Sequence, residues 1–292
     1  MSSSTTTTGT RRRFFEQEPY RRTPWGPRPD FAKKEVADFF VDNVFAWAVE
    51  YQVDGFRHDS VSNLRALDGQ GTVPGGVPLL QRMNEVTEAA RPGALLIAED
   101  LKGAASVTGT RVSGGLGFDT QWDGGFQYNV TAAATAATDE GRNLAAVRDA
   151  LAVTYNGDPF QRLLYVESHD TAGNDGARLP LRIDGADPTS LAARRRAMLA
   201  AGILLTAPGV PMMFMGQEML EDTKFLPAPA PIDWSKATTN AGVLAFYKDM
   251  IRRRRLGSAA PTSVNMTAAT RDGMPATAAL ALGPYAMVVL SR

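Results

Sequence analysis

Short apolar runs alternate with longer segments of helical periodicity through most of the chain. The segments whose apolar residues recur at helical spacing are 33–50, 78–90, 144–153 and 189–205. The apolar runs of strand length, each ending in polar or charged residues, are 51–56, 94–100, 163–170 and 209–218. Asp30 is expected to cap the first helix, and Thr189 or Ser190 the last. Continuous apolar strands separated by helices indicate a parallel sheet covered on both faces, so the predicted fold class is α/β.

The two ends of the chain depart from this alternation. Residues 1–23 begin with a Ser/Thr tract and three arginines and contain little that a core could bury, so we expect a disordered tail. Residues 257–292 alternate and turn like a β-hairpin, which predicts the start of a C-terminal β domain. The intervening residues 24–256 are predicted to form one α/β domain.

Composition narrows the possible functions. The 292 residues carry 31 basic and 31 acidic side chains, 2 histidines and no cysteine. A formal charge of zero gives no general electrostatic attraction to nucleic acid or to an anionic membrane, and we expect neither as a partner. Without cysteine there is no disulfide framework or thiol nucleophile, and two histidines are too few for a His-rich metal centre. The apolar runs are also far shorter than the roughly 20 residues of a membrane-spanning helix.

Three short arginine runs could suggest a nucleic-acid surface, but helix positions explain them better. The runs are Arg11–Arg13, Arg194–Arg196 and Arg252–Arg255. The second falls inside a predicted helix, and the third lies near a helix carboxyl end, where cations interact favourably with the helix dipole.

Acidic residues follow three of the predicted strands, and their neighbours suggest catalysis. The residues are Asp59, Glu99 and Asp170, with Arg57 two positions before the first and His169 directly before the third. A single such aspartate commonly caps a helix, but the carboxyl ends of strands in α/β folds are also where chemistry is located. Three acidic residues in this arrangement therefore favour an active site.

The surroundings of each acid suggest a role. Arg57 and Asp59 are spaced so that both point to the same side of a strand, and an adjacent cation keeps a carboxylate ionised, as a nucleophile requires. Glu99 follows four apolar residues, and apolar surroundings raise a carboxyl pKa, which suits a general acid. Asp170 would add a charge that steadies a cationic transition state. These roles describe retaining glycoside hydrolysis, in which the first two carboxyls lie roughly 5 to 5.5 Å apart.

Four motifs carry a resemblance to a known family. DGFRHD (54–59), IAED (97–100), ESHD (167–170) and GVPMMFMGQE (209–218) resemble, in order and spacing, the motifs of the α-amylase family, glycoside hydrolase family 13. Three further segments resemble glycogen branching enzymes and maltooligosyltrehalose trehalohydrolases within it: TPWGPRPD (23–30), LGFDTQWDGGF (116–126) and APIDW (230–234).

The resemblance implies a (β/α)8 TIM barrel whose fourth, fifth and seventh strands end in the nucleophile, the acid/base and a stabilising aspartate. By motif position these are Asp59, Glu99 and Asp170, with Arg57 orienting the nucleophile and His169 contacting a sugar hydroxyl. No cofactor is needed for the retaining mechanism, and no metal site is expected. The other histidine, at position 58, is expected to face the helical layer and to be structural.

One motif of the family has no counterpart. The Asp-x-x-x-Asn-His sequence that ends the third strand is absent, so the segments near 53, 94, 118, 163 and 209 account for strands four to eight. We therefore expect an incomplete barrel, the catalytic domain at 24–256, and a truncated β domain after it. Open barrel edges present unpaired backbone, so self-association or a partner chain is expected there.

The expected activity is that of a cytoplasmic glycosidase or transglycosidase acting on α-1,4-glucan or maltooligosaccharides. Branching transfer and trehalohydrolase-like hydrolysis share the glycosyl-enzyme intermediate, and the sequence leaves the choice between them open. The missing first motif motivates an alternative, in which a catalytically inactive fragment binds glucan or pairs with another chain.

Overall fold

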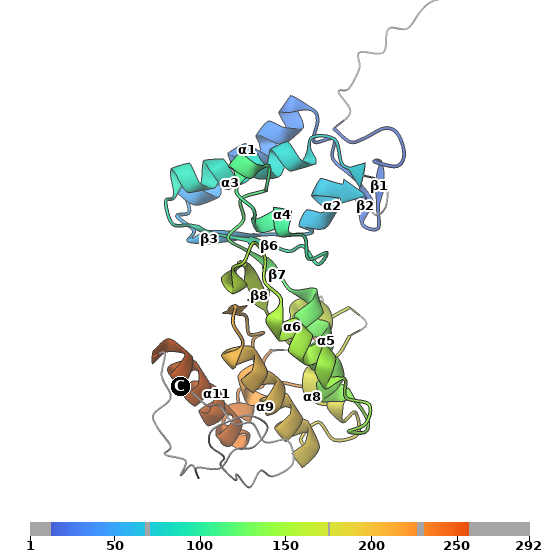
Figure 1. Ribbon diagram of the computed structural model, residues 1–292, viewed down its shortest axis with the longest axis vertical. Coiled ribbons are helices and arrows are strands. Elements are labelled where there is room, and N and C mark those ends of the chain that lie inside the picture. The colour runs from blue at the N-terminus through green and yellow to red at the C-terminus, as the bar shows by residue number, and fades with distance from the viewer. Residues whose placement is uncertain (1–12, 68–70, 175, 227–230, 257–292) are drawn as a thin grey trace, which may run out of the picture. The chain divides into compact units, whose positions relative to one another are not determined.

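The computed structural model of the chain describes residues 13–67, 71–174, 176–226 and 231–256 (Figure 1). These residues form two compact units, one made of the described residues up to 124 with 154–163 and the other of 125–153 with the described residues from 164 onward. Each unit is described separately below, and a single domain over 24–256 stays a prediction. The predicted C-terminal β domain at 257–292 lies outside the described residues.

The first unit begins with an ordered segment where the sequence predicted a tail. The backbone N–H of Phe15 donates to the carbonyl of Arg28 at 3.1 Å, and the Phe15 ring meets that of Phe31 edge-on at 6.4 Å. The disordered tail predicted for residues 1–23 is therefore too long, because its aromatic side chains pack on the domain from about residue 13 onward.

Helices and strands of the first unit follow the predicted alternation. Its helices are α1 (Lys34–Val49), α2 (Val61–Arg65), α3 (Gly76–Ala90) and α4 (Ala105–Thr108), with 3-10 turns η1 (Arg111–Ser113) and η2 (Pro159–Gln161). Its strands are β1 (Arg22–Thr23), β2 (Gly26–Pro27), β3 (Gly55–His58), β4 (Ala66–Leu67), β5 (Gly71–Thr72), β6 (Leu95–Ala98), β7 (Thr120–Trp122) and β8 (Arg162–Leu164). Helix α1 starts at Lys34 without a side-chain cap, so the prediction that Asp30 caps it is wrong; Asp30 accepts from the Ala32 N–H instead.

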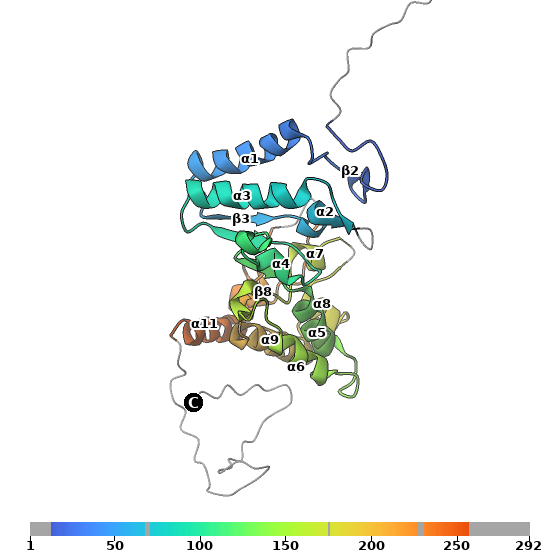
Figure 2. The same ribbon diagram turned by 45° about the horizontal axis from the view of Figure 1, so that its top comes forward.

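Apolar faces hold α1 and α3 together beside the sheet. Val41 and Val44 of α1 are buried in one cluster with Leu79 and Met83 of α3, and Figure 2 shows the two helices side by side next to β3. This is the packing expected of helices whose apolar residues recur every three to four positions.

The sheet that carries the candidate residues is parallel, in the order β3-β6-β7-β8-β9. Strand β3 pairs with β6 so that Arg57 lies opposite Ile97, and β6 pairs with β7 so that Ile97 lies opposite Thr120. The last residue of β8, Leu164, belongs to the second unit, where its carbonyl accepts the N–H of Met212 at 2.8 Å. Among the described residues β3 and β9 are the outer strands, and binding of a partner along them stays a prediction.

The second unit is mainly helical. Its elements are α5 (Gly124–Thr135), α6 (Leu144–Ala152), α7 (His169–Ala172), α8 (Leu179–Ile183), α9 (Leu191–Thr206), β9 (Val210–Pro211), η3 (Gln217–Met219), α10 (Lys236–Thr239) and α11 (Ala241–Leu256). Helices α9 and α11 lie side by side (Figure 1), and Leu204 and Tyr247 are buried in their common core. Ser190 caps α9 as predicted, since its hydroxyl accepts the N–H of Ala193 at 3.1 Å.

Part of the third arginine run has a structural role at the end of α9. Arg254 donates to the carbonyls of Leu205 and Ala207, both at 2.9 Å. These carbonyls lie at the helix carboxyl end, where backbone acceptors lack partners within the helix.

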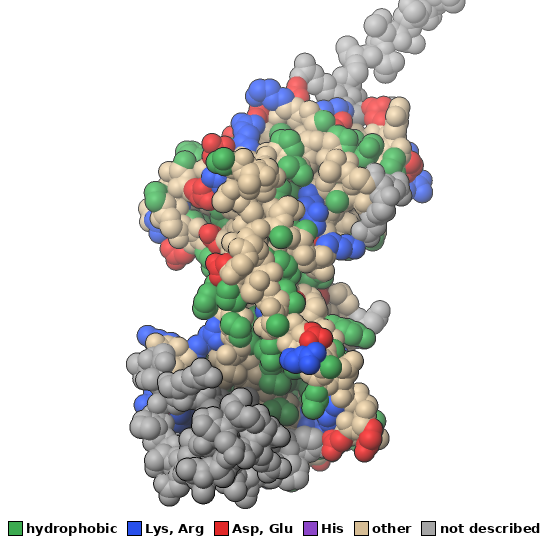
Figure 3. Space-filling view, in the orientation of Figure 1, with side chains coloured by type: hydrophobic (Ala, Val, Ile, Leu, Met, Phe, Trp, Pro, Cys, Tyr) green, Lys and Arg blue, Asp and Glu red, His purple; other side chains and the backbone are tan. Residues whose placement is uncertain are grey.

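Acidic and basic side chains are interspersed on the visible face of the described residues (Figure 3). None of the helices in those residues is both long and apolar enough to cross a membrane.

His58 is a buried neutral residue in the first unit. Its side chain is 8% exposed, its ring meets that of Phe118 at 5.1 Å, and Nε2 has no hydrogen-bond partner among the described residues. Burial lowers the pKa of His58 from 6.5 to about 4, because the charged ring would lose its hydration. The residue is therefore structural, as the sequence suggested.

The lowered pKa of His58 predicts a loss of stability in mild acid. The unfolded chain takes up this proton near pH 6.5 and the folded chain only near pH 4, so the free energy of unfolding falls between these values by about 3 kcal/mol in total. Urea unfolding of the wild type and of His58→Gln at pH 7 and pH 4.5 measures this difference. An unchanged dependence in His58→Gln would contradict the assignment.

A buried ion pair joins β8 to the end of β7. The side chain of Arg162 is fully buried, and its Nε donates to Asp123 Oδ2 at 2.6 Å. Because a charge left buried without its partner is costly, we expect Arg162→Met to lower the free energy of unfolding by about 3–5 kcal/mol. The double variant Arg162→Met/Asp123→Leu should recover most of that loss in denaturant titrations. Equal destabilisation of the single and double variants would show that the pair does not act as a unit.

Candidate active site

The pairing of β3 with β6 places two of the predicted acids beside each other. Arg57 lies opposite Ile97 in a parallel register, and side chains alternate along a strand. Asp59 is two residues beyond Arg57, and Glu99 is two residues beyond Ile97. The two acids therefore lie at the ends of neighbouring strands, on the same side of the sheet as Arg57. The register alone thus brings together residues that are forty positions apart in sequence.

Arg57 contacts both carboxylates. Its Nη1 donates to Asp59 Oδ1, and its Nη2 lies 3.1 Å from Glu99 Oε2. The Asp59 side chain is 74% exposed and that of Glu99 only 15%, so one carboxylate faces solvent and the other is largely enclosed. The sequence predicted apolar surroundings for Glu99, but the structure instead places a guanidinium group against it.

The backbone between the two acids also holds Glu99. Ser60 adopts a left-handed conformation (φ 52°, ψ 40°), and its N–H donates to Glu99 Oε2 at 2.6 Å. The N–H of Glu99 donates to the carbonyl of His58, and the N–H of Val61 donates to the carbonyl of Glu99, both at 2.9 Å. A non-glycine residue in this region of φ and ψ is strained by about 1–3 kcal/mol, a cost that often marks functional sites. No side-chain signal in the sequence points to Ser60.

Trp122 supports Arg57 from the third strand. The guanidinium carbon of Arg57 lies 4.6 Å from the centroid of the Trp122 ring, which is 4% exposed. Since Ile97 pairs with Thr120, the residue two positions on, Trp122, falls in the same row as Glu99. A cation over an aromatic face is attracted by the ring, so Trp122 fixes the arginine that contacts both acids. Trp122 is therefore a buried support for the candidate site.

His169 and Asp170 lie in the second unit, on helix α7. Strand β8 ends at Leu164, so Asp170 does not directly follow a strand as expected; it lies in the first turn of α7. His169 Nε2 is 3.4 Å from Asp170 Oδ2, and both side chains are 45% exposed. Ser168 and Thr171 cap this short helix reciprocally. The structure thus brings Arg57, Asp59 and Glu99 together in the first unit, and His169 and Asp170 in the second.

The other acid of the IAED motif is structural. Asp100 is fully buried and binds Arg65 through both oxygens, at 2.5 Å to Nε and 3.1 Å to Nη2. Because Asp100 follows Glu99 directly, its side chain points to the opposite side. This alternation places the structural acid Asp100 and the candidate Glu99 on opposite sides of the strand end.

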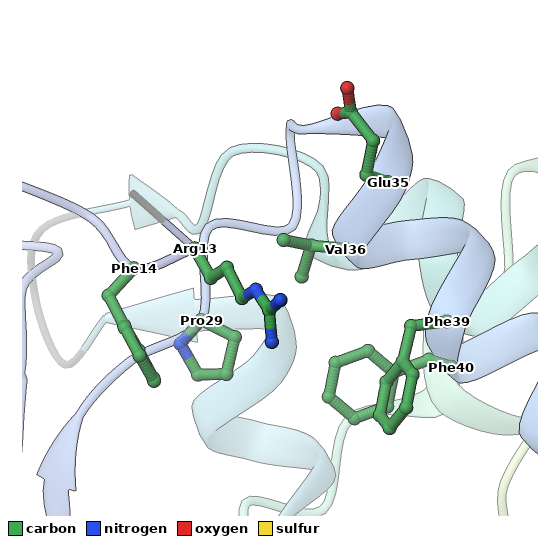
Figure 4. Close-up of a pocket in the computed structure, with 7 residues that line it drawn as sticks. All are labelled: Arg13, Phe14, Pro29, Glu35, Val36, Phe39 and Phe40. Atoms are coloured by element: carbon green, nitrogen blue, oxygen red, sulfur yellow. The ribbon is translucent and has the colours of Figure 1, made fainter. Parts of the chain in front are cut away.

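Neither a metal cluster nor the groove on α1 adds to this site. Within the described residues, no three histidine, aspartate or glutamate side chains are arranged to hold a metal ion. A groove of about 370 Å³ lies beside α1. In Figure 4, Arg13 extends between Phe14 and the rings of Phe39 and Phe40, while Glu35 points away. None of the predicted site residues lines this groove.

Comparison with known proteins gives consistent results. No protein-family model matches the chain. A 1,4-α-glucan branching enzyme of Bacillus subtilis is 30% identical over 202 residues, which cover 68% of this chain and 31% of that enzyme. One from Corynebacterium efficiens is 31% identical over 222 residues, covering 70% of this chain and 30% of the enzyme. The chain therefore spans about a third of the length of these relatives.

Solved structures agree on the fold. Pullulanase type I from Bacillus subtilis, complexed with maltose, aligns with a TM-score of 0.64 at 23% identity, covering 83% of this chain and 36% of that one. An α-amylase from Geobacillus thermoleovorans, complexed with acarbose, aligns with a TM-score of 0.59 at 19% identity, covering 86% of this chain and 51% of that one. The predicted fold class is confirmed: the five-stranded parallel sheet with its helices is consistent with part of an α-amylase-type (β/α)8 barrel, and the numbering of these strands as four to eight stays a prediction. The chain thus resembles the α-amylase family: its sequence is similar to about a third of a 1,4-α-glucan branching enzyme, and its fold to that of α-amylase structures.

Proposed function

We propose that this chain carries the catalytic acids of a retaining enzyme that acts on α-1,4-glucans, with branching transfer as the favoured outcome. The observation that supports the proposal best is the pair of carboxylates, Asp59 and Glu99, that leave adjacent parallel strands and contact one guanidinium. The sequence relatives are 1,4-α-glucan branching enzymes, and this similarity supports the substrate class and the transfer reaction. The cytoplasmic location expected from the sequence belongs to the same proposal.

Asp59 is the proposed nucleophile. Its contact with Arg57 fixes one carboxylate oxygen, and its exposed position makes it accessible to an anomeric carbon. Attack by the carboxylate forms a bond from its oxygen to that carbon, while the bond from the carbon to the leaving oxygen breaks. The glycosyl group is then held on the enzyme as an ester.

Glu99 is the proposed acid and base. In the first step its carboxyl group gives a proton to the leaving oxygen, and in the second its carboxylate takes a proton from the incoming hydroxyl. The enclosed position of Glu99 and its hydrogen bond from Ser60 hold it in a fixed orientation, as proton transfer requires. Asp170 is assigned the stabilisation of the cationic transition state, and His169 contact with a sugar hydroxyl, as the family resemblance implies.

Product analysis tests the proposed outcome. Purified chain incubated with amylose should form new α-1,6 linkages, seen by proton NMR and by debranching followed by mass analysis. Free maltooligosaccharides or trehalose without new linkages would instead indicate hydrolysis. Amylose that binds but is not altered would contradict the catalytic proposal and support the reading of an inactive glucan-binding chain.

Variants at the two acids should separate their roles. Asp59→Asn should lower turnover by more than about a thousandfold on both amylose and maltosyl fluoride, because both substrates need the nucleophile. Glu99→Gln should lower turnover of amylose by about 10²–10⁴-fold. Its loss should be much smaller for glycosylation by maltosyl fluoride, because fluoride leaves without a proton.

The control for these variants is Asp149→Asn, which changes an exposed aspartate of α6 that pairs with its neighbour Arg148. It should behave like the wild type on both substrates. Retained turnover in Asp59→Asn would overturn the roles assigned here, and so would a rate of glycosylation by maltosyl fluoride that Glu99→Gln lowers as much as it lowers turnover of amylose.

A further inference from the structure

The segment that carries His169 and Asp170 connects the end of β8 to the start of α8 within the second unit. Its described residues are 165–174 and 176–178, and they include the short helix α7. Helix α7 has only four residues, which is too short for a helix to keep its geometry without outside contacts. The contacts that hold this segment therefore determine where Asp170 points.

Glu167 joins the two ends of this segment. Its side chain is 2% exposed, and its Oε1 accepts the backbone N–H of Leu179, twelve positions further on, at 2.6 Å. Leu179 is the first residue of α8 and is itself buried. Because the first N–H groups of a helix have no partner within it, Glu167 supplies an acceptor that α8 needs. One buried hydrogen bond thus closes the loop that contains α7.

The backbone around α7 leaves little room for adjustment. A Cβ at Gly173 would lie 2.6 Å from the carbonyl oxygen of His169 and 2.7 Å from that of Phe225. The N–H of Phe225 also donates to the carbonyl of Ala172, the last residue of α7, at 3.0 Å. We therefore expect loss of the contact at Glu167 to move the helix, because its close-packed backbone cannot absorb the change.

The contacts of the Asp170 carboxylate itself are weak. Its Oδ2 is 3.4 Å from His169 Nε2, and its Oδ1 accepts from the Asn174 amide, also at 3.4 Å. Both distances exceed the 2.7–3.2 Å of ordinary hydrogen bonds, and the Asp170 and Asn174 side chains are exposed to solvent. The direction of the carboxylate therefore depends on the backbone of α7.

We propose that Glu167 is a positioning residue for Asp170 and His169: by accepting the Leu179 N–H it fixes α7, which sets the direction of both side chains. This inference rests on the proposed function, which gives Asp170 and His169 their roles at the reacting sugar. Glu167 acts through these residues, because its own side chain is enclosed.

The acceptor oxygen of Glu167 matters here, and its charge does not. Burial raises the pKa of the Glu167 carboxyl, although the Leu179 N–H and the nearby Arg178 and Arg182 favour the ionised form. A neutral carboxamide offers an acceptor oxygen in the same place. Glu167→Gln should therefore keep α7 in position, whereas Glu167→Met fills the same space without an acceptor.

Histidine NMR tests the positioning without any need for turnover, because the chain has only two histidines, at 58 and 169. The His169 ring resonances are assigned by their loss in His169→Gln. Asp170→Asn should move them, since the two side chains are neighbours. This displacement should be the same in Glu167→Gln as in the wild type and should shrink to about half or less in Glu167→Met, as expected when a change uncouples two residues.

The matched control is Asn143→Ala, which removes the side-chain acceptor at the start of another helix of the same unit. Asn143 caps α6 by accepting the N–H of Ala146 at 3.0 Å. Its loss should leave the His169 displacement at the wild-type value. Should Glu167→Met not fold, Glu167→Asp replaces it, because a carboxyl one methylene shorter cannot keep the 2.6 Å contact with Leu179.

Turnover of amylose gives a second reading. Glu167→Met should lower kcat by about 10- to 100-fold with KM nearly unchanged, because a misplaced group stabilises the transition state less. In the Asp170→Asn background the same change should cost less than about twofold, since the residue through which Glu167 acts is already lost. A purely structural role would lower kcat by the same factor in both backgrounds.

The outcomes separate this inference from the catalytic proposal. The positioning role is overturned by a His169 displacement that Glu167→Met leaves unchanged, that Asn143→Ala reduces as much, or that Glu167→Gln fails to keep. Turnover of amylose without this coupling between Glu167 and His169 would refute the positioning role alone. Coupling in a wild-type chain that shows no turnover would support the positioning role and contradict the catalytic proposal.

Discussion

The parallel register between β3 and β6 is the constraint on which the candidate site depends. Pairing of Arg57 with Ile97 puts Asp59 beside Glu99, and a shift of one residue would turn Glu99 to the other side and bring the structural acid Asp100 in its place. Hydrogen bonds between the ends of the two strands stabilise this register. Glu99 exchanges backbone hydrogen bonds with His58 and Val61, and its side chain accepts the N–H of Ser60. The pairing of β3 with β6 therefore determines which acid lies beside Asp59.

Two buried ion pairs fix the ends of the strands near the candidate acids. Asp100 binds Arg65 beside β6, and Asp123 binds Arg162 between β7 and β8. Each pair lies where a parallel strand ends, so the loops that leave the sheet are fixed by interactions that solvent does not screen. Arg57 connects the buried part of the domain with the candidate site, since it packs on the buried Trp122 and also contacts the two candidate acids. The packing of the domain and the geometry of the candidate acids therefore both depend on the Arg57 guanidinium.

Periodicity predicted the helices well, because α1, α3, α6 and α9 each bury one face and their apolar spacing records it. Strands were predicted too long. Tyr165 and Val166 are buried but follow the end of β8, and hydrophobicity cannot distinguish burial from pairing in a ladder. The motif residues Arg57, Asp59 and Glu99 were found from sequence because their positions after apolar runs are regular. Ser60 was not, since its left-handed backbone conformation depends on tertiary contacts that no local pattern encodes.

The most direct test of the account is to capture the covalent intermediate on Asp59. Glu99→Gln treated with maltosyl fluoride should accumulate the glycosyl-enzyme, because formation needs no acid whereas its release needs the base. Trypsin cleaves after Arg57 and Arg65, and the peptide 58–65 contains Asp59 as its only acidic side chain. Mass spectrometry should find that peptide heavier by one maltosyl group. A maltosyl group on any other peptide, or fluoride release with peptide 58–65 unmodified, would contradict the central claim.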